Sequence, residues 1–319
     1  KNIAAQPAPL RWVFASAMRA ASRQRRGERA GIVGTAALAI ARKAIFAKVI
    51  ARFGGRLRFA VSGAAALSRG VAEFVETLGI DLFEGYAMTE TGGVGTINSP
   101  GAKRIGSVGK PVPGVRVELD KTGRGGDAEQ GEVVIHGPVV MEGYHNNPDE
   151  TRAALTPEGG LRTGDLGKLD ADGFLYITGR VKELYKLENG KYIAPAPLEE
   201  QIALSPYIAQ AMIHGSNRPY NVALLVPDLA ALRDWARAHE VPADDVARLF
   251  ADERVKRLIA EEIERHSAEW KSYEHIRNFA LVSEEFSTTN DMLTPTLKVK
   301  RRNVVQRYRD RIDALYAAG

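Results

Sequence analysis

The sequence predicts an α/β region, then a small β-barrel-like region, and then a separate α+β domain. Three observations support this fold class. Two short apolar strands flank a helix over residues 57–84, short apolar runs alternate with turn signals over 105–178, and charged helices with a few strands follow residue 183. The chain has 319 residues, and about 100–200 residues make one domain, so two domains are expected.

Residues 1–58 are predicted to form basic helices. Arg and Ala dominate residues 10–53, and Gly27, Gly31 and Gly34 are expected to interrupt the helix. From residue 41 the apolar side chains repeat on one helical face, and Gly54-Gly55 marks its end. The members of that face are Ile45, Phe46, Val49, Ile50 and Phe53.

Residues 59–104 form the predicted α/β region. A strand at 57–61 leads into a loop of small residues, a helix follows, and a second strand covers 80–84. Ser68 is the expected N-cap of the helix, and Gly79 is its expected C-terminal stop. The expected buried face of this helix comprises Val71, Phe74, Val75 and Leu78.

Residues 105–178 are predicted to form a small antiparallel sheet or barrel, because strand-like runs at 115–119, 132–135 and 173–177 are separated by turns. A domain boundary is expected near 179–183. Beyond it, the sequence predicts helices at 196–204, 229–239 and 246–270 and strands at 207–214, 221–226 and 278–283. This mixture is typical of an α+β unit.

The composition excludes several classes of protein. The chain has no cysteine, which excludes a disulfide framework, a thiolate nucleophile and a metal site with sulfur ligands. It has no Walker A pattern and no Gly-x-Ser-x-Gly, and its six histidines show no metal-ligand spacing. The longest uncharged apolar stretch, residues 31–41, is far shorter than the roughly 20 residues that a membrane-spanning helix needs. We expect a cytoplasmic protein.

The net charge of +5 is distributed unevenly. Residues 1–58 carry 13 Lys and Arg against one acidic residue, a net charge of +12, and the remaining residues carry −7. Because the basicity is local, it does not predict a nucleic-acid partner. Trp12 and Phe14 lie among the arginines of residues 11–29, which leaves two interpretations open. One is a peripheral contact with anionic lipid head groups, and the other, which we favour, is an ordinary solvated helix face.

Three polar, glycine-containing loops carry the candidate chemistry. In residues 86–93, the hydroxyl of Thr89 can contact a phosphate oxygen and the carboxylate of Glu90 can hold Mg²⁺, because the loop follows a buried strand. In residues 163–167, Asp165 between two glycines can accept hydrogen bonds from both hydroxyls of a ribose. Residues 179–183 lie at the expected domain junction, where ligand contacts and hinges are common. Each loop also has a non-functional interpretation. Residues 86–93 could be an ordinary polar turn, Asp165 could stabilise its own turn, and residues 179–183 could be a solvated basic linker.

Taken together and in this order, the loops resemble those of the AMP-forming acyl-CoA synthetases, which belong to the adenylate-forming superfamily. The resemblance covers residue 41 to the C-terminus. It is carried by segments 56–68, 85–93, 131–151, 163–167, 179–183 and 293–301. Segments 185–195 and 294–298 are similar to those of long-chain fatty acid–CoA ligases, whereas other branches have Ser-Gly-Lys in the latter.

The resemblance implies a role for each matching residue. Thr89 would contact the α-phosphate, Glu90 would hold Mg²⁺, and Lys298 would bridge the carboxylate and the α-phosphate during catalysis. Lys182 matches the hinge position. The residues that would bind the adenosine part of the nucleotide are Ser62, Gly63, Ala64, Tyr86, Asp165 and Arg180.

The resemblance also implies the reaction and the organisation of the protein. The family joins a fatty acid to ATP, releases pyrophosphate, and lets CoA displace AMP from the acyl-adenylate; it uses Mg²⁺. Residues 1–178 would be the C-terminal part of a larger domain, with a basic helical segment (1–58), an α/β part (59–104) and a β-barrel-like part (105–178). Residues 179–182 would be a hinge, and 183–319 a small mobile domain.

Two departures from the family pattern bear on function. Ala64, Ala66 and Ala87 replace usual Gly or Pro residues, and an alanine at a positive φ would be strained. The phosphate-binding loop that ends in Pro-Lys-Gly is absent, so we expect that the chain is inactive by itself. The alternatives are another acyl-adenylating ligase, with a different acid or a carrier-protein acceptor, and a non-catalytic nucleotide-binding homologue.

Overall fold

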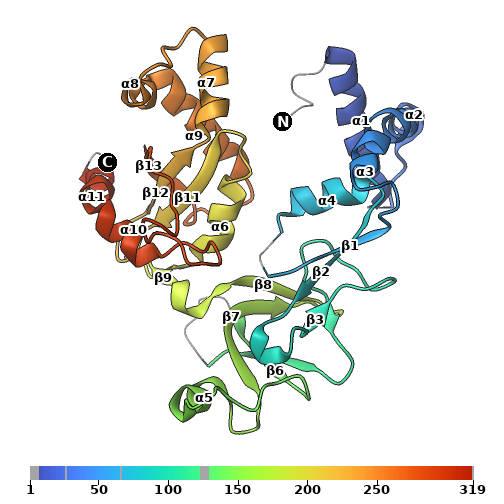
Figure 1. The fold of residues 1–319 in the computed structure, drawn as a ribbon, viewed down its shortest axis with the longest axis vertical. Coiled ribbons are helices and arrows are strands. Elements are labelled where there is room, and N and C mark those ends of the chain that lie inside the picture. Colours follow the sequence, from blue (N-terminus) through green and yellow to red (C-terminus); the bar gives the residue numbers. More distant parts are fainter. Residues whose placement is uncertain (1–6, 26, 65–66, 123–128, 318–319) are drawn as a thin grey trace. The chain divides into compact units, whose positions relative to one another are not determined.

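The computed structural model describes residues 7–25, 27–64, 67–122 and 129–317. The chain divides into two compact units, with the boundary between Ile177 and Thr178, and each unit is described by itself. The helices of the first unit are α1 (Ala8–Arg25), α2 (Gly31–Ala41), the π-helical turn η1 (Arg42–Phe46), α3 (Ala47–Arg52), α4 (Arg69–Thr77), the 3₁₀ turn η2 (Thr89–Thr91) and α5 (Pro148–Ala154) (Figure 1). Within the described ranges, no helix is both long enough and apolar enough to cross a membrane.

Helices α1 and α2 pack against each other through small side chains (Figure 1). Ala17, Ala20 and Ala37 are at most 3% exposed, and a Cβ on Gly34 would lie 3.1 Å from the Cβ of Ala20. The sequence predicted that Gly34 interrupts a helix, and this prediction is wrong. Gly34 lies inside α2, where its missing side chain lets the two helices approach closely.

One predicted buried position of α4 is wrong, because Val71 in its first turn is 40% exposed. Phe53, which the sequence placed on the apolar face of the preceding helix, follows the end of α3 and is 60% exposed. The predicted helix ends are confirmed. The backbone N–H of Val71 donates to Ser68 Oγ over 3.3 Å, and Gly79 follows α4 with a φ of 91°.

The first sheet has the order β1-β2-β3-β4, with β1 (Phe59–Ser62), β2 (Asp81–Tyr86), β3 (Thr96–Ile97) and β4 (Lys110–Pro111). Strands β1 and β2 are parallel, which the helix between them permits, and the later pairs are antiparallel. The parallel pair places the loop after β1 beside the end of β2. That edge of the sheet holds two of the predicted site segments.

The second sheet has the order β5-β6-β7-β8, with β5 (Arg116–Asp120), β6 (Gly131–His136), β7 (Leu161–Leu169) and β8 (Leu175–Arg180). Strand β7 was not predicted. The two sheets are connected by backbone hydrogen bonds, because Val108 N donates to Leu175 O over 2.8 Å and Leu175 N donates to Gly109 O over 2.9 Å. These bonds join the segment before β4 to the start of β8, and the barrel-like character of residues 105–178 stays a prediction.

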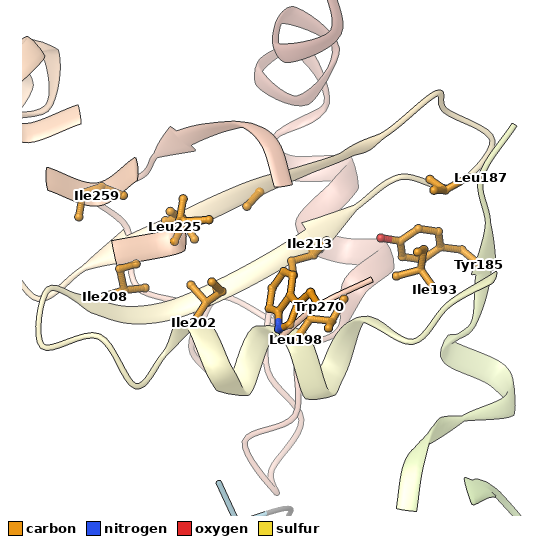
Figure 2. Close-up of a cluster of buried hydrophobic side chains, with 13 residues drawn as sticks. Tyr185, Leu187, Ile193, Leu198, Ile202, Ile208, Ile213, Leu225, Ile259 and Trp270 are labelled. Carbon is orange, nitrogen blue, oxygen red and sulfur yellow. The ribbon is translucent and has the colours of Figure 1, made fainter. Parts of the chain in front are cut away.

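The second unit contains a three-stranded sheet of order β11-β12-β13, in which β11 and β12 are antiparallel and β12 and β13 are parallel. Its elements are η3 (Val181–Glu183), β9 (Tyr185–Lys186), β10 (Tyr192–Ile193), α6 (Pro195–Ile202), β11 (Ile208–His214), β12 (Asn221–Pro227), α7 (Leu229–Ala238), α8 (Val246–Ala251), α9 (Glu253–His266), β13 (Ile276–Leu281), α10 (Arg301–Arg307) and α11 (Arg309–Ala317). Figure 2 shows Leu198 and Ile202 of α6 packed against the sheet residues Ile208, Ile213 and Leu225.

The single helix predicted over 246–270 is two helices, α8 and α9. The break falls at Asp252, whose side chain accepts the backbone N–H of Arg254 over 2.9 Å and so caps the start of α9. Helices α10 and α11, which were not predicted, form the C-terminal part of the unit.

Candidate active site

The loop after β1 touches the end of β2. Gly63 follows the last residue of β1, and a Cβ on it would lie 3.3 Å from the carbonyl oxygen of Gly85. Ala64 has a φ of 67°, so the expected strain of an alanine in the left-handed region is present there. Ala87 does not have a positive φ, and Ala66 lies outside the described residues. The loop 62–64 therefore lies directly beside the strand end that carries Tyr86.

Tyr86 and Asp165 are joined although they are 79 residues apart. The Tyr86 hydroxyl donates to Asp165 Oδ2 over 2.5 Å, which connects the end of β2 to β7. Asp165 is 6% exposed, and a buried carboxylate needs such hydrogen bonds. Tyr86 and Asp165, to which the resemblance gives roles in binding adenosine, are therefore in direct contact.

The sequence predicted a loop around Asp165, but this residue lies on a bulged strand, β7. Strands β6 and β7 pair regularly at both ends, but three residues of β7, 163–165, lie opposite a single residue of β6. Gly164 has a φ of 72°, and the Thr163 hydroxyl donates to the carbonyl of Val133 over 2.8 Å. A bulge changes the direction in which a side chain points, and here it acts on Asp165.

Carboxylates on β5 and β6 hold the bulged part of β7 through ion pairs with Arg162. Arg162 Nη1 contacts Asp120 Oδ2 over 2.7 Å and Glu132 Oε2 over 2.9 Å. The other carboxylate oxygen of Glu132 accepts the backbone N–H of Gly164 over 3.1 Å. Hydrogen bonds from Thr122 and from Arg162 lower the pKa of Asp120 to about 2, so Asp120 stays charged. Sequence reasoning missed this support, because its members lie up to 42 residues apart.

Glu90 is held by the segment 141–151. Its carbonyl oxygen accepts the backbone N–H of Met141 over 2.9 Å, and its Oε1 accepts the hydroxyl of Tyr144 over 2.9 Å. The bond to Glu90 is the main cause of the raised pKa of Tyr144. The backbone of Tyr144 is fixed in turn, because its N–H donates to Thr151 Oγ1 over 2.9 Å. The contact between Tyr144 and Glu90 could not be found from sequence spacing.

The residues around Glu90 fit a metal ion that arrives with phosphate. Within the ranges that the structure describes, no group of three or more His, Asp or Glu side chains could hold a metal. Mg²⁺ is commonly bound by one or two carboxylates together with substrate phosphates. A single carboxylate at Glu90, next to the exposed Thr89, fits that manner of binding.

Arg180, Lys182 and Lys298 belong to the second unit, so their placement is described within it. Arg180 ends β8 and Lys182 lies in η3, and both are exposed. A Cβ on Gly179 would lie 2.7 Å from the Cβ of Ala194, so the chain passes closely over the start of α6 there.

Lys298 follows a tight turn. The backbone N–H of Thr294 donates to the carbonyl of Lys298 over 2.8 Å, and the N–H of Lys298 donates to Thr294 Oγ1 over 3.0 Å. Leu293 and Val299 form an isolated bridge at the base of the turn. Lys298 itself is exposed, which leaves its amine accessible to a ligand.

Arg301, three residues after Lys298, forms an ion pair with Glu199 inside the second unit. Arg301 contacts both carboxylate oxygens of Glu199, over 2.7 and 2.9 Å, and donates to the carbonyl of Ile213 over 2.7 Å. The backbone N–H of Ile213 donates to Glu199 Oε1 over 2.6 Å. The pair joins α10 to α6 and β11.

Comparison with known proteins gives a consistent result for both parts of the chain. The family model described as AMP-binding enzyme matches residues 11–145, and the one described as AMP-binding enzyme C-terminal domain matches residues 183–319. The long-chain-fatty-acid–CoA ligase FadD15 of Mycobacterium bovis is 36% identical over 287 residues, which are 90% of this chain and 46% of that protein. The chain thus spans about half the length of the curated relatives that it matches.

Two solved structures show the same fold. The adenylation domain of the carboxylate reductase from Mycobacterium chelonae has a TM-score of 0.68 and 26% identity, and the match covers 96% of this chain and 45% of that one. The A domain of the carboxylic acid reductase from Segniliparus rugosus, solved with AMP and a co-purified carboxylic acid, has a TM-score of 0.66 and 25% identity, with the same coverage.

Proposed function

Because the chain belongs to the AMP-binding enzymes of the adenylate-forming superfamily, we propose that its protein is a long-chain fatty acid–CoA ligase that works through an acyl-adenylate. The observation that carries the proposal is the hydrogen bond between Tyr86 and Asp165 beside the loop 62–64. The choice of a fatty acid rests on the 36% identity to the Mycobacterium bovis ligase.

The adenosine part of ATP binds at the junction of the two sheets in the first unit. The ring of Tyr86 packs on the adenine, and Ser62, Gly63 and Ala64 line the same pocket. Asp165 accepts hydrogen bonds from both ribose hydroxyls, which a carboxylate with two oxygens does well, and Arg180 assists it. The short distance between Tyr86 and Asp165 supports this assignment, because base and ribose are adjacent in a nucleotide.

The first chemical step joins two anions. A carboxylate oxygen of the fatty acid attacks the α-phosphorus of ATP, the bond to the β-phosphate oxygen breaks, and pyrophosphate leaves with the electron pair. Thr89 donates to the α-phosphate, and Lys298 bridges that phosphate and the carboxylate, so that a cation meets the developing charge. Magnesium, when it is bound at Glu90, neutralises phosphate charge.

The second step uses the other face of the small domain. Lys182 acts as the hinge about which the small domain turns, and Lys298 leaves the site. The sulfur of CoA then attacks the carbonyl carbon, and AMP leaves with the electron pair of the broken C–O bond. Lys298 is therefore needed for adenylation alone.

The test separates the two steps in the full-length protein. Lys298→Ala should abolish ATP–pyrophosphate exchange driven by a fatty acid, yet thioester formation from supplied acyl-AMP should persist. Arg302→Ala, which removes an exposed cation four residues away, is the matched control and should change neither step. Exchange that survives in Lys298→Ala contradicts the role of the lysine.

The acceptor is the main point on which relatives differ. A second candidate is another acyl-adenylating ligase with a carrier-protein acceptor, because the solved structures with this fold include the adenylation domain of an enzyme that is not named as a CoA ligase. Acyl transfer to free CoA and to a phosphopantetheinylated carrier, measured side by side with fatty acids of different length, distinguishes the two.

A peripheral contact with anionic lipid, the less favoured of the two interpretations of residues 11–29, stays a proposal, and the neighbouring helix α2 would extend such a surface. Ile32, Val33 and Ile40 lie on α2 and are 91%, 63% and 54% exposed, and Arg42 and Lys43 follow the helix directly. An apolar face next to cations suits anionic lipid. Co-sedimentation with liposomes should rise with anionic lipid and fall with salt; binding that ignores both contradicts the proposal.

A further inference from the structure

Leu297 combines two features that are each unfavourable. Its φ is 61°, in the left-handed region that a bulky L-residue rarely adopts, and its side chain is 71% exposed, so burial does not compensate for the strain. Among the described residues other than glycine with a positive φ, the rest are Ala64, Asn146, Asn217, Glu240 and Asp291, which are small or polar. A large apolar side chain at this position therefore calls for a reason.

The turn itself holds Leu297 in this conformation. Its backbone N–H donates to the carbonyl of Thr294 over 2.8 Å, and the hydroxyls of Thr294 and Thr296 are 3.0 Å apart. At the base of the turn, Leu293 is 7% exposed and packs in a core of the second unit with Val299. Strain of this kind persists where the surrounding structure fixes it, and it is concentrated at ligand contacts.

We propose that Leu297 is a specificity-determining residue that contacts the alkyl carbons of the fatty acid next to its carboxylate. The inference rests on the proposed function, in which Lys298 reaches that carboxylate. Because consecutive Cα atoms are about 3.8 Å apart, Leu297 stands directly beside the residue whose amine meets the carboxylate, and its exposed side chain is available to the first methylene groups of the substrate. An exposed apolar side chain beside a cation matches a substrate with an alkyl chain beside a carboxylate.

The test is a set of substitutions of Leu297 in the full-length protein. Leu297→Met keeps an apolar side chain, Leu297→Ala removes most of it, and Leu297→Asn removes the apolar character but tolerates a positive φ. The Ala and Asn variants should raise the KM for the fatty acid in the adenylation step about tenfold, and the KM for ATP should change less than twofold. Leu297→Met should stay within threefold of the parent for both.

Stability provides the readout that separates contact from folding. Because the side chain is largely exposed, none of the three variants should lower the midpoint of thermal unfolding, and Leu297→Asn should equal or exceed the parent by up to about 4 °C. An unchanged KM for the fatty acid in the Ala and Asn variants overturns the proposal, as does an equal rise in the KM for ATP. Lys298→Ala, assayed in parallel, reports separately on the proposed function, because adenylation that survives there refutes the lysine's role whatever Leu297 does.

Discussion

Arg301 and Glu199 form an ion pair inside the second unit, and Arg301→Met breaks it. The side chains are 20% and 9% exposed, and the guanidinium contacts both carboxylate oxygens. After the substitution, Glu199 keeps only its hydrogen bond from the backbone of Ile213 among these contacts. The carboxylate is then left in the interior without its cation, which is far more costly than losing a pair on the surface.

The expected loss of stability follows from this burial. Breaking a buried pair by removal of one partner costs about 3–5 kcal/mol, and the partial exposure of Arg301 places the value near the lower end. For a unit of this size, about 3 kcal/mol lowers the unfolding midpoint by roughly 10 °C. A double variant, Glu199→Gln with Arg301→Met, should recover at least about 1 kcal/mol, because a neutral amide replaces the uncompensated charge.

Urea titration of the chain, followed by tryptophan fluorescence, measures these changes. Trp270 lies in the same core as α6 and is 9% exposed, so its emission reports on the second unit (Figure 2). Arg302→Met is the matched control, because Arg302 is exposed, and it should stay within about 0.5 kcal/mol of the parent. A loss below about 1 kcal/mol for Arg301→Met would refute the reasoning.

Three further predictions concern both units. Gly109→Ala should lower the stability of the first unit by more than about 4 kcal/mol or prevent its folding, because a Cβ would lie 1.9 Å from the backbone of β3. Gly173 has a similar φ but lies in open space, so Gly173→Ala should cost only about 1–2 kcal/mol. Thermal unfolding of the two variants measures the difference. Partial desolvation, together with the nearby carboxylates of Glu199 and Glu183, raises the pKa of Glu200 to about 7, although part of its side chain is exposed. The folded state therefore binds this proton more tightly than the unfolded state, and stability from this group falls as the pH rises from 4.5 to 7. Glu200→Gln should therefore flatten the decline of the unfolding midpoint between pH 4.5 and 8, and an unaltered slope speaks against this cause. Tyr86→Phe removes the hydrogen bond to Asp165 and should weaken AMP binding about 5–10-fold in calorimetry, and an unchanged Kd contradicts the shared role of the two residues.

Local signals in the sequence predicted much of the fold. Ser68 and Gly79 bound α4 because a cap and a left-handed stop act within a few residues. Strands β11 and β12 were predicted from apolar runs, and β12 is buried along its whole length. Strand β7 was missed, because its glycines and polar residues lack the pattern of a strand and its pairing with β6 supplies the order instead.

The candidate site was less accessible to such reasoning. Their place in polar, glycine-containing loops singled out Glu90 and Asp165, but the contact of Asp165 with Tyr86 spans 79 residues, and that of Glu90 with Tyr144 spans 54. Chain folding brings these side chains together, and no local pattern records the approach. Gly34 illustrates the same limit, because the residue that it touches, Ala20, belongs to another helix.

In the part of the chain that the structure describes, each of the five buried clusters belongs to one of the two units that meet between Ile177 and Thr178. Cooperativity in unfolding comes from shared interior contacts, so we expect the chain to melt in two steps and to have no single unfolding free energy. A defect in one interior then stays confined to it. During synthesis, the residues of the clusters described in the first unit are made before most of the second unit, so a folding error in the later part need not undo the earlier one.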